Sequence, residues 1–177
     1  MKSALVKKAA AYARFHHEGQ FRKGEAREPY ITHVEEVAQL VHEFGGDDLA
    51  VAAAWLHDVV EDCEPSIVDI ESQFGASVAS IVAEVTDDKS LPKTERKQLQ
   101  ISTADKKSEA ACLIKWADKS SNLRSIALSP PPWSDARKDE YIAWAKRVTE
   151  CLQHKPDNAK KYFEDSVQMV LTYARAE

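Results

Sequence analysis

The sequence predicts an all-α fold, a compact multi-helix bundle of about eight helices. Three observations lead to this prediction. Apolar residues recur at helical spacing along most of the 177 residues, no stretch of useful length alternates apolar with polar residues, and glycine (5) and proline (7) are scarce. Because a chain of this length has room for one hydrophobic core, residues 1–177 are expected to form a single domain.

The first half of the chain carries five expected helices, each bounded by a start or stop signal. The first helix covers about residues 3–18 and ends at Gly19, and the second begins near residues 31–33 and ends at Gly45-Gly46. The third covers residues 47–62, with Asp47 or Asp48 as its N-cap. The fourth covers residues 66–74 and ends at Gly75, and the fifth covers residues 76–86. The third of these is too apolar to be exposed, so we expect it at the centre of the core.

The second half continues the same pattern. It comprises a polar surface helix or flexible lid over about 88–109, a helix to about residue 128, a helix after the proline run with Ser134 as its N-cap, and a last amphipathic helix over 157–174. The four tryptophans, at positions 55, 116, 133 and 144, lie among apolar neighbours and are expected in the core.

Composition narrows the function. Lys and Arg number 24 against 29 Asp and Glu, a formal net charge of −5, which disfavours nucleic acid and membrane surfaces as partners. The three cysteines are far apart and lack any CxxC spacing, which predicts a reducing, cytoplasmic location without disulfides or a zinc knuckle. No signal peptide or membrane-spanning run is recognisable. A phosphate-bearing ligand therefore needs a local basic site.

Acidic residues crowd around a histidine at the end of the expected central helix. His57 and Asp58 are followed one turn later by Glu61 and Asp62, and spacing of four residues places each later residue over an earlier one. Three neighbouring carboxylates repel one another unless a cation lies between them. The cluster therefore predicts a divalent metal ion.

Two further residues, His33 and Asp118, can complete a ligand set of two histidines and two aspartates. Mixed nitrogen and oxygen ligands suit Mn²⁺, Fe²⁺ or Zn²⁺ better than Mg²⁺ or Ca²⁺, which prefer oxygen alone. Open coordination positions would remain for water and substrate.

The order His33, His57-Asp58, Asp118 resembles the ligand pattern of the HD phosphohydrolase superfamily. The surrounding phrases FRKGEAREPYITH, AAAWLHDVVED, LPKTERKQLQ and KWADKSSNLR are similar to the hydrolase domain of RelA/SpoT homologues, over about residues 14–145. The similarity is greatest to small alarmone hydrolases of the metazoan SpoT-homologue type, which consist of this domain alone.

This resemblance implies Mn²⁺-dependent hydrolysis of the 3′-pyrophosphate of (p)ppGpp to GDP or GTP and pyrophosphate. It makes Glu61 and Asp62 the residues that orient water and move protons. By the same resemblance, the nucleotide-binding residues are Arg22, Lys23, Asn122, Arg137 and Tyr141. The stretch after about residue 154 matches the family weakly, and packing or homo-oligomerisation is its expected role.

The sequence departs from the family pattern at two positions. Val34 stands where the family has proline, and Cys63 where it has threonine, but neither change removes a ligand or a proton carrier. The same site could act on ppApp or on the 2′-phosphate of NADPH, since a few pocket contacts decide the base. A catalytically silent, metal-bound nucleotide sensor is disfavoured because all six ligand and catalytic positions are intact.

Overall fold

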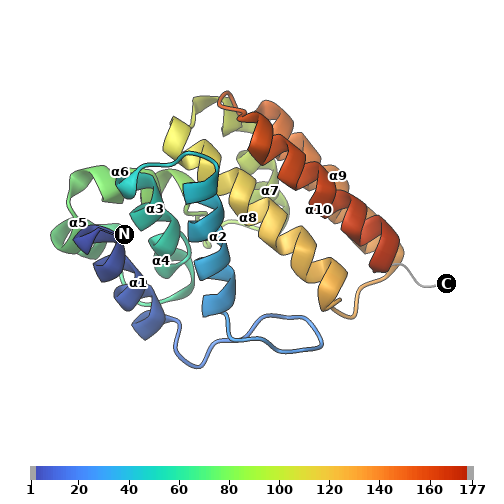
Figure 1. Ribbon diagram of the computed structural model, residues 1–177, viewed down its shortest axis with the longest axis horizontal. Helices are drawn as coiled ribbons and strands as arrows, with labels where there is room; N and C mark the ends of the chain where they lie inside the picture. The colour runs from blue at the N-terminus through green and yellow to red at the C-terminus, as the bar shows by residue number, and fades with distance from the viewer. Residues whose placement is uncertain (1–2, 175–177) are drawn as a thin grey trace.

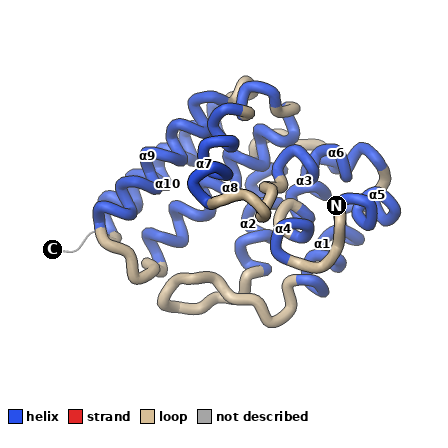
Figure 2. Tube along the Cα trace, turned by 180° about the vertical axis from the view of Figure 1, so that it is seen from behind, coloured by secondary structure: helices blue, strands red, loops and turns tan. Residues whose placement is uncertain are grey.

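The computed structural model describes residues 3–174 and confirms the all-α prediction. Within that range there are ten α-helices, one short 3-10 helix and no strand; the single β-bridge pairs Phe21 with Pro29 in the loop before the second helix. Figure 1 shows the helices coloured along the chain, and Figure 2 shows them from behind. No helix in this part of the chain is long and apolar enough to cross a membrane.

Most helices follow one another with short connections, but a long loop over residues 17–30 joins the first two. Their bounds are α1 Ala4–His16, α2 Ile31–Glu43, α3 Asp48–Leu56, α4 Val59–Asp62, α5 Ile67–Phe74, α6 Ala76–Val85, α7 Lys93–Ser102, η1 Ala104–Lys106, α8 Glu109–Leu128, α9 Asp135–Cys151 and α10 Asp157–Tyr173.

Helix α3 lies in the middle of the hydrophobic core. Every residue from Ala50 to Leu56 is buried, as its nearly continuous apolar sequence requires. Helices α1, α2, α6 and α8 all pack against it, and the small alanine side chains let these neighbours approach closely. The long helix α8 connects this half of the molecule to the other half, formed by α9 and α10 (Figure 1).

The last helix, α10, packs along α8. It buries Ala159, Phe163 and Val167, and the Phe163 ring meets Trp116 of α8 edge-on at 5.5 Å between ring centroids. The Trp116 indole Nε1 donates to the carbonyl of His154, which fixes the segment before α10. The expected packing role of the chain after residue 154 is therefore met within one molecule.

Two expected N-caps are present, and one expected helix is divided. Asp47 accepts from the Ala50 amide at 2.9 Å and Ser134 from the Arg137 amide at 3.3 Å. The helix expected over 47–62 ends at Leu56 and resumes at Val59, so His57 and Asp58 lie in a turn rather than on one continuous helix. This break, together with a regular helix α7 in the polar segment, raises the number of helices above the expected eight.

Candidate metal centre and active site

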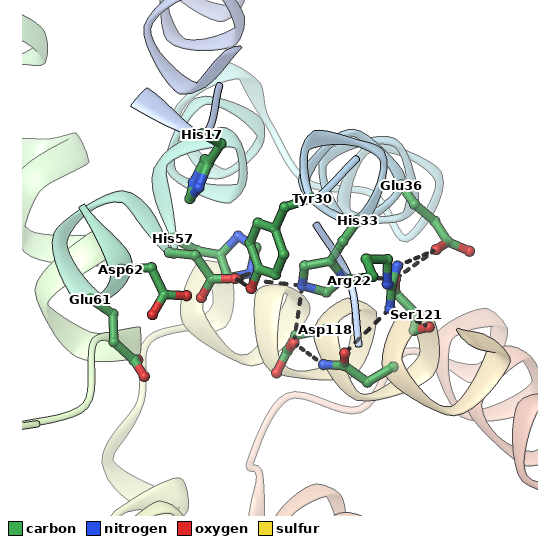
Figure 3. A network of polar contacts seen from close by, with 12 residues as sticks. His17, Arg22, Tyr30, His33, Glu36, His57, Glu61, Asp62, Asp118 and Ser121 are labelled. Atoms are coloured by element: carbon green, nitrogen blue, oxygen red, sulfur yellow. Dashed lines mark hydrogen bonds and ion pairs between the residues drawn. The ribbon is translucent and has the colours of Figure 1, made fainter. Parts of the chain in front are cut away.

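The four predicted metal ligands come together from three elements. His33 lies in the first turn of α2, His57 and Asp58 in the turn after α3, and Asp118 in the middle of α8. The His33 Nε2 atom is 3.6 Å from Asp58 Oδ2 and 3.5 Å from Asp118 Oδ1, and His57 Nε2 is 3.1 Å from Asp58 Oδ2. Figure 3 shows His33 and Asp118 facing each other across this centre, with His57 beside them.

The chemistry of these groups fits a divalent cation. His57 donates from Nδ1 to the Ala54 carbonyl at 2.7 Å, because a carbonyl oxygen can only accept, and this leaves Nε2 for the centre. That Nε2 is buried, and its contact with Asp58 Oδ2 at 3.1 Å does not have the geometry of a full hydrogen bond. His33, His57 and Asp58 each offer one ligand atom, all within 4.8 Å of one another, so they could hold one ion.

The electrostatics also favour positive charge at this place. Burial by itself lowers the pKa of His57, but the Asp58 carboxylate and the hydrogen bonds around the ring outweigh it and raise that pKa to about 9. Burial raises the pKa of Asp58 and of Asp118, yet His57 beside the first and Lys119 beside the second hold both pKa values well below the usual range. The carboxylates are thus ionised and attract a cation.

Tyr30 supports the centre from outside. Its hydroxyl donates to Asp58 Oδ2 at 2.5 Å, and burial followed by the Asp58 charge raises the pKa of this phenol. The Tyr30 ring lies 5.5 Å from the His33 ring and 5.1 Å from the His17 ring, centroid to centroid. The hydrogen bond and the ring contacts restrain Asp58 in one orientation.

Glu61 and Asp62 lie on helix α4, to one side of the metal-ligand cluster (Figure 3). Glu61 Oε2 accepts from the Asp87 amide at 3.2 Å, and Glu61 Oε1 lies 3.7 Å from Arg96. Asp62 pairs with Lys89. Burial, and then the charge of Asp58, raises the pKa of Glu61, which suits a group that exchanges protons near neutral pH.

A cavity of about 710 Å³ extends from these carboxylates between α7, α8 and α9. Its volume is in the range of small-molecule and cofactor sites. Side chains of α7, including Arg96 and Lys97, line one wall of it. Figure 2 shows α7 in front of α8. The predicted site residues that line it are Arg22, Lys23, His57, Asp58, Glu61, Asp62, Asp118, Asn122, Arg137 and Tyr141. His33 does not line this cavity but lies buried behind the centre.

The end of the cavity next to α9 is basic and aromatic. Lys97 and Lys119 lie over the Trp144 ring with Nζ at 4.7 and 4.3 Å from its centroid, and the Arg137 guanidinium carbon is 4.4 Å from the centroid of Trp133. Burial, and then the charge of Lys93, lowers the pKa of Lys97. Lys97 and Arg137 are held mainly by ring faces, which keeps their charge available to an anionic ligand, whereas Lys119 is also paired with Asp118 at 2.8 Å.

The predicted nucleotide residues occupy different environments. Arg22 is nearly buried, with donors 3.4 Å from the Ser121 hydroxyl and 3.4 Å from Asn122 Oδ1, whereas Lys23 is exposed at the cavity. Asn122 donates to Asp118 Oδ1 at 2.6 Å, as four-residue spacing on one helix face predicts. Arg22 and Asn122 thus brace the metal-ligand cluster as well as lining the cavity.

Sequence reasoning missed several residues of this site. Tyr30, Lys89 and Arg96 contact Asp58, Asp62 and Glu61, but their spacing from these partners carries no local signal. The tryptophan prediction was correct for Trp55 and Trp116, which are buried, whereas Trp133 and Trp144 are half-buried and line the cavity. An aromatic residue at helical spacing looks the same whether it fills a core or a pocket wall.

Comparison with known proteins identifies relatives whose similarity covers all the candidate site residues. Residues 9–142 match the HD domain family. The chain is 46% identical to the guanosine-3′,5′-bis(diphosphate) 3′-pyrophosphohydrolase MESH1 of Drosophila melanogaster over 154 residues, which cover 85% of this chain and 86% of that protein. MESH1 of Homo sapiens shows the same identity and the same coverage.

Two solved structures are similar to this chain in both fold and sequence. A metazoan orthologue of SpoT that hydrolyses ppGpp and plays a role in starvation responses aligns with a TM-score of 0.89 and 42% identity, covering 95% of this chain and 96% of its own. The protein lmo0812 of Listeria monocytogenes aligns with a TM-score of 0.66 and 30% identity, covering 80% of this chain and 98% of its own. The chain belongs to the HD domain family, in the group that contains the metazoan SpoT orthologues.

Proposed function

We propose that this chain is a divalent-metal-dependent phosphohydrolase that removes the 3′-pyrophosphate from guanosine tetra- and pentaphosphate, leaving GDP or GTP. One observation carries the proposal: a carboxylate pair, Glu61 and Asp62, flanks an intact ligand set at one end of a cavity whose other end is basic. The names of the relatives support the same reaction and substrate.

His33, His57, Asp58 and Asp118 would hold the ion, and we propose Mn²⁺, with Fe²⁺ or Zn²⁺ as ions the same donors accept. A bound divalent ion supplies a lowered pKa for water and neutralises phosphoryl oxygen charge. The burial of His33 and His57 supports a resident cofactor, because buried imidazoles that face two carboxylates form a preformed site.

Glu61 and Asp62 are the proton carriers in this proposal. Water oxygen forms a bond to the phosphorus attached to O3′, the bond from that phosphorus to O3′ breaks, and pyrophosphate leaves. Glu61, whose pKa is raised by burial, accepts the proton from water, and the 3′-oxygen leaves as a hydroxyl after taking a proton from the carboxyl pair. The positive charges of Arg96 and Lys89 reduce the repulsion between the Glu61 and Asp62 carboxylates between turnovers.

The rest of the substrate fits the remainder of the cavity. Lys97 and Arg137 offer positive charge for the 5′-phosphates, and Tyr141 and Trp144 offer ring faces. Arg22, Lys23 and Asn122 lie along the wall nearest the metal-ligand cluster and would contact the nucleoside and the 3′-phosphates. The three cysteines are free thiols, which supports a reducing, cytoplasmic location for this activity.

The test is product analysis with metal-stripped protein given Mn²⁺ and, separately, ppGpp, ppApp, NADPH and a 5′-nucleotide. We expect GDP and pyrophosphate from ppGpp in equal amounts. His57→Ala should abolish turnover together with metal binding, and Glu61→Gln should lower kcat by about 10²- to 10⁴-fold while metal binding remains.

Glu64→Gln is the matched control, since Glu64 is exposed next to the same helix and does not line the cavity. It should leave kcat unchanged. A folded, metal-loaded protein that turns over none of these substrates would overturn the proposal. Faster turnover of ppApp or NADPH than of ppGpp would keep the metal chemistry and replace the substrate.

A further inference from the structure

We propose that Ser121 and Glu36 are positioning residues of the metal centre, a hydroxyl and carboxylate pair that holds His33 in the tautomer whose Nε2 can bind a cation. The inference rests on the metal site of the proposed function and adds two residues to it. Figure 3 shows Ser121, Glu36 and Arg22 on the side of His33 away from Glu61 and Asp62, so they are placed to support the centre rather than to touch the reacting groups.

The Ser121 hydroxyl makes three polar contacts. It donates its only proton to Glu36 Oε2 at 2.6 Å, because an ionised carboxylate can only accept. His33 Nδ1 lies 2.9 Å from the same hydroxyl oxygen, and an Arg22 guanidinium nitrogen lies 3.4 Å from it. With its proton engaged, the Ser121 oxygen has only lone pairs left for His33 and Arg22.

These contacts determine which nitrogen of the His33 ring carries a proton. Since Ser121 cannot donate to Nδ1, His33 Nδ1 must carry a hydrogen and donate it, and the neutral ring then presents a lone pair at Nε2. That Nε2 lies 3.6 Å from Asp58 Oδ2 and 3.5 Å from Asp118 Oδ1, at the ligand cluster. The tautomer that ligates a metal is thus set before any ion arrives.

The pair is built into the packed part of the molecule. Ser121 and His33 are buried, with exposed fractions of 0% and 1%, so water does not compete for the contact between them, whereas the Glu36 side chain is 32% exposed. Glu36 is one turn after His33 on α2, and its other oxygen lies 3.3 Å from the Arg124 side chain of α8. Arg124 therefore holds the Glu36 carboxylate in place while it accepts from Ser121.

The test compares the metal affinity of two variants, each of which removes the hydroxyl of one of two neighbouring serines. Removal of an outer hydrogen-bond partner of a metal-bound histidine lowers metal affinity by about 10- to 100-fold, and we expect that loss for Ser121→Ala with Zn²⁺ or Mn²⁺ alone, measured by competition with a chromophoric chelator. Ser120→Ala is the matched control, because Ser120 is equally buried but donates to the Trp116 carbonyl within α8. It should change the affinity less than about twofold.

Glu36→Gln gives a second variant with nearly the same shape. An amide can donate to Ser121 and turn its hydroxyl proton toward His33, so we expect about tenfold weaker metal binding. All variants are first melted in chelator. A melting temperature that drops equally for Ser120→Ala and Ser121→Ala, with the affinity loss confined to Ser121→Ala, separates a positioning role from a merely structural one.

A spectroscopic readout of the wild-type chain applies even where a variant does not fold. In ¹⁵N-labelled, Zn²⁺-loaded protein we expect the His33 ring to be protonated at Nδ1 and metal-bound at Nε2, with the signal assigned through a His33→Asn sample. Protonation at Nε2, or wild-type affinity in Ser121→Ala, would overturn this inference and leave the proposed function standing. Failure of the wild-type chain to bind either ion would overturn both.

Discussion

Charged side chains around the site are largely shielded from water and lie next to specific partners. Asp118 has Lys119 Nζ at 2.8 Å and the Asn122 amide at 2.6 Å, while Asp58 is held by Tyr30 and flanked by His57. An unpaired charge at such positions would cost several kcal/mol, so each of these partners is part of the reason the site can exist in the core.

Lys115 is the exception, since its partner is uncharged. Its Nζ donates to the Val85 carbonyl at 2.9 Å, at the C-terminal end of α6, and the side chain is 5% exposed. Burial, and then the charge of Lys119, lowers the pKa of Lys115 to about 8. In the folded state Lys115 therefore loses its proton above about pH 8, whereas the unfolded chain keeps it up to about pH 10.4.

The shift of the Lys115 pKa predicts a stability that rises with pH. Between about 8 and 10.4 the unfolded chain binds more protons than the folded one, so the free energy of unfolding increases over this window and the contribution is unfavourable below it. From pH 7.5 to 9.5 we expect metal-stripped wild type to gain about 2 kcal/mol relative to Lys115→Met, measured by urea unfolding. Lys160 is exposed, so Lys160→Met should show the same pH dependence of the free energy of unfolding as wild type. If the difference in this free energy between wild type and Lys115→Met does not change with pH, the lowered pKa of Lys115 is refuted.

At the scale of elements, irregular backbone places the reactive side chains. The turn at His57 and Asp58 separates α3 from α4, so the ligands project from a helix end while Glu61 and Asp62 follow on a separate short helix. The loop between α1 and α2 places Arg22 and Lys23 at the cavity. This loop is attached to the end of α8, where the Ala26 amide donates to the Ser129 hydroxyl at 2.9 Å.

Gly24 permits this attachment. A Cβ atom at position 24 would overlap the carbonyl and hydroxyl oxygens of Ser129, so any larger residue has to push the loop off α8. We expect Gly24→Ala to lower the free energy of unfolding by about 1–3 kcal/mol and to raise KM for the nucleotide more than it lowers kcat, because Arg22 and Lys23 move with the loop. Steady-state kinetics and urea unfolding measure both effects.

The control for this substitution is Glu25→Ala in the same loop. Glu25 is exposed, so its truncation changes neither the packing against α8 nor the loop position. Equal kinetic effects of the two variants would show that the close approach at Gly24 does not matter.

At the scale of the whole molecule, the proposed metal ligands join separate parts of the fold. They come from α2, from the turn after α3 and from α8, and α8 in turn carries α10. A ligand that binds only the folded state stabilises it by mass action, so an ion held by these three segments should stabilise the entire domain.

Removal of the ion should therefore lower global stability. With free Mn²⁺ at 1,000 times its dissociation constant, we expect a free energy of unfolding about 4 kcal/mol higher than in chelator. Thermal melts with and without Mn²⁺ measure this difference, and His57→Ala should show no such dependence. An equal Mn²⁺ effect on wild type and His57→Ala would place the stabilising ion elsewhere.

Local patterns in the sequence were sufficient for much of the fold. Apolar spacing and stop signals predicted most helices within a few residues, and the caps at Asp47 and Ser134 are short-range hydrogen bonds that sequence spacing determines. The break at His57 and Asp58 was not predicted, because each residue continues a helical pattern and only the surrounding packing ends it.

The sequence by itself determined the all-α class and which residue types the proposed ligand set and the carboxylate pair contain, since residue type and local spacing are properties of the chain. Only the tertiary structure decided that Tyr30 holds Asp58, that Trp144 lines a cavity, and that Ser121 of α8 contacts His33 of α2. The Ser121 and His33 positions are 88 residues apart. Contacts at such separation arise when helices pack, and helix packing depends on the whole core rather than on any local segment.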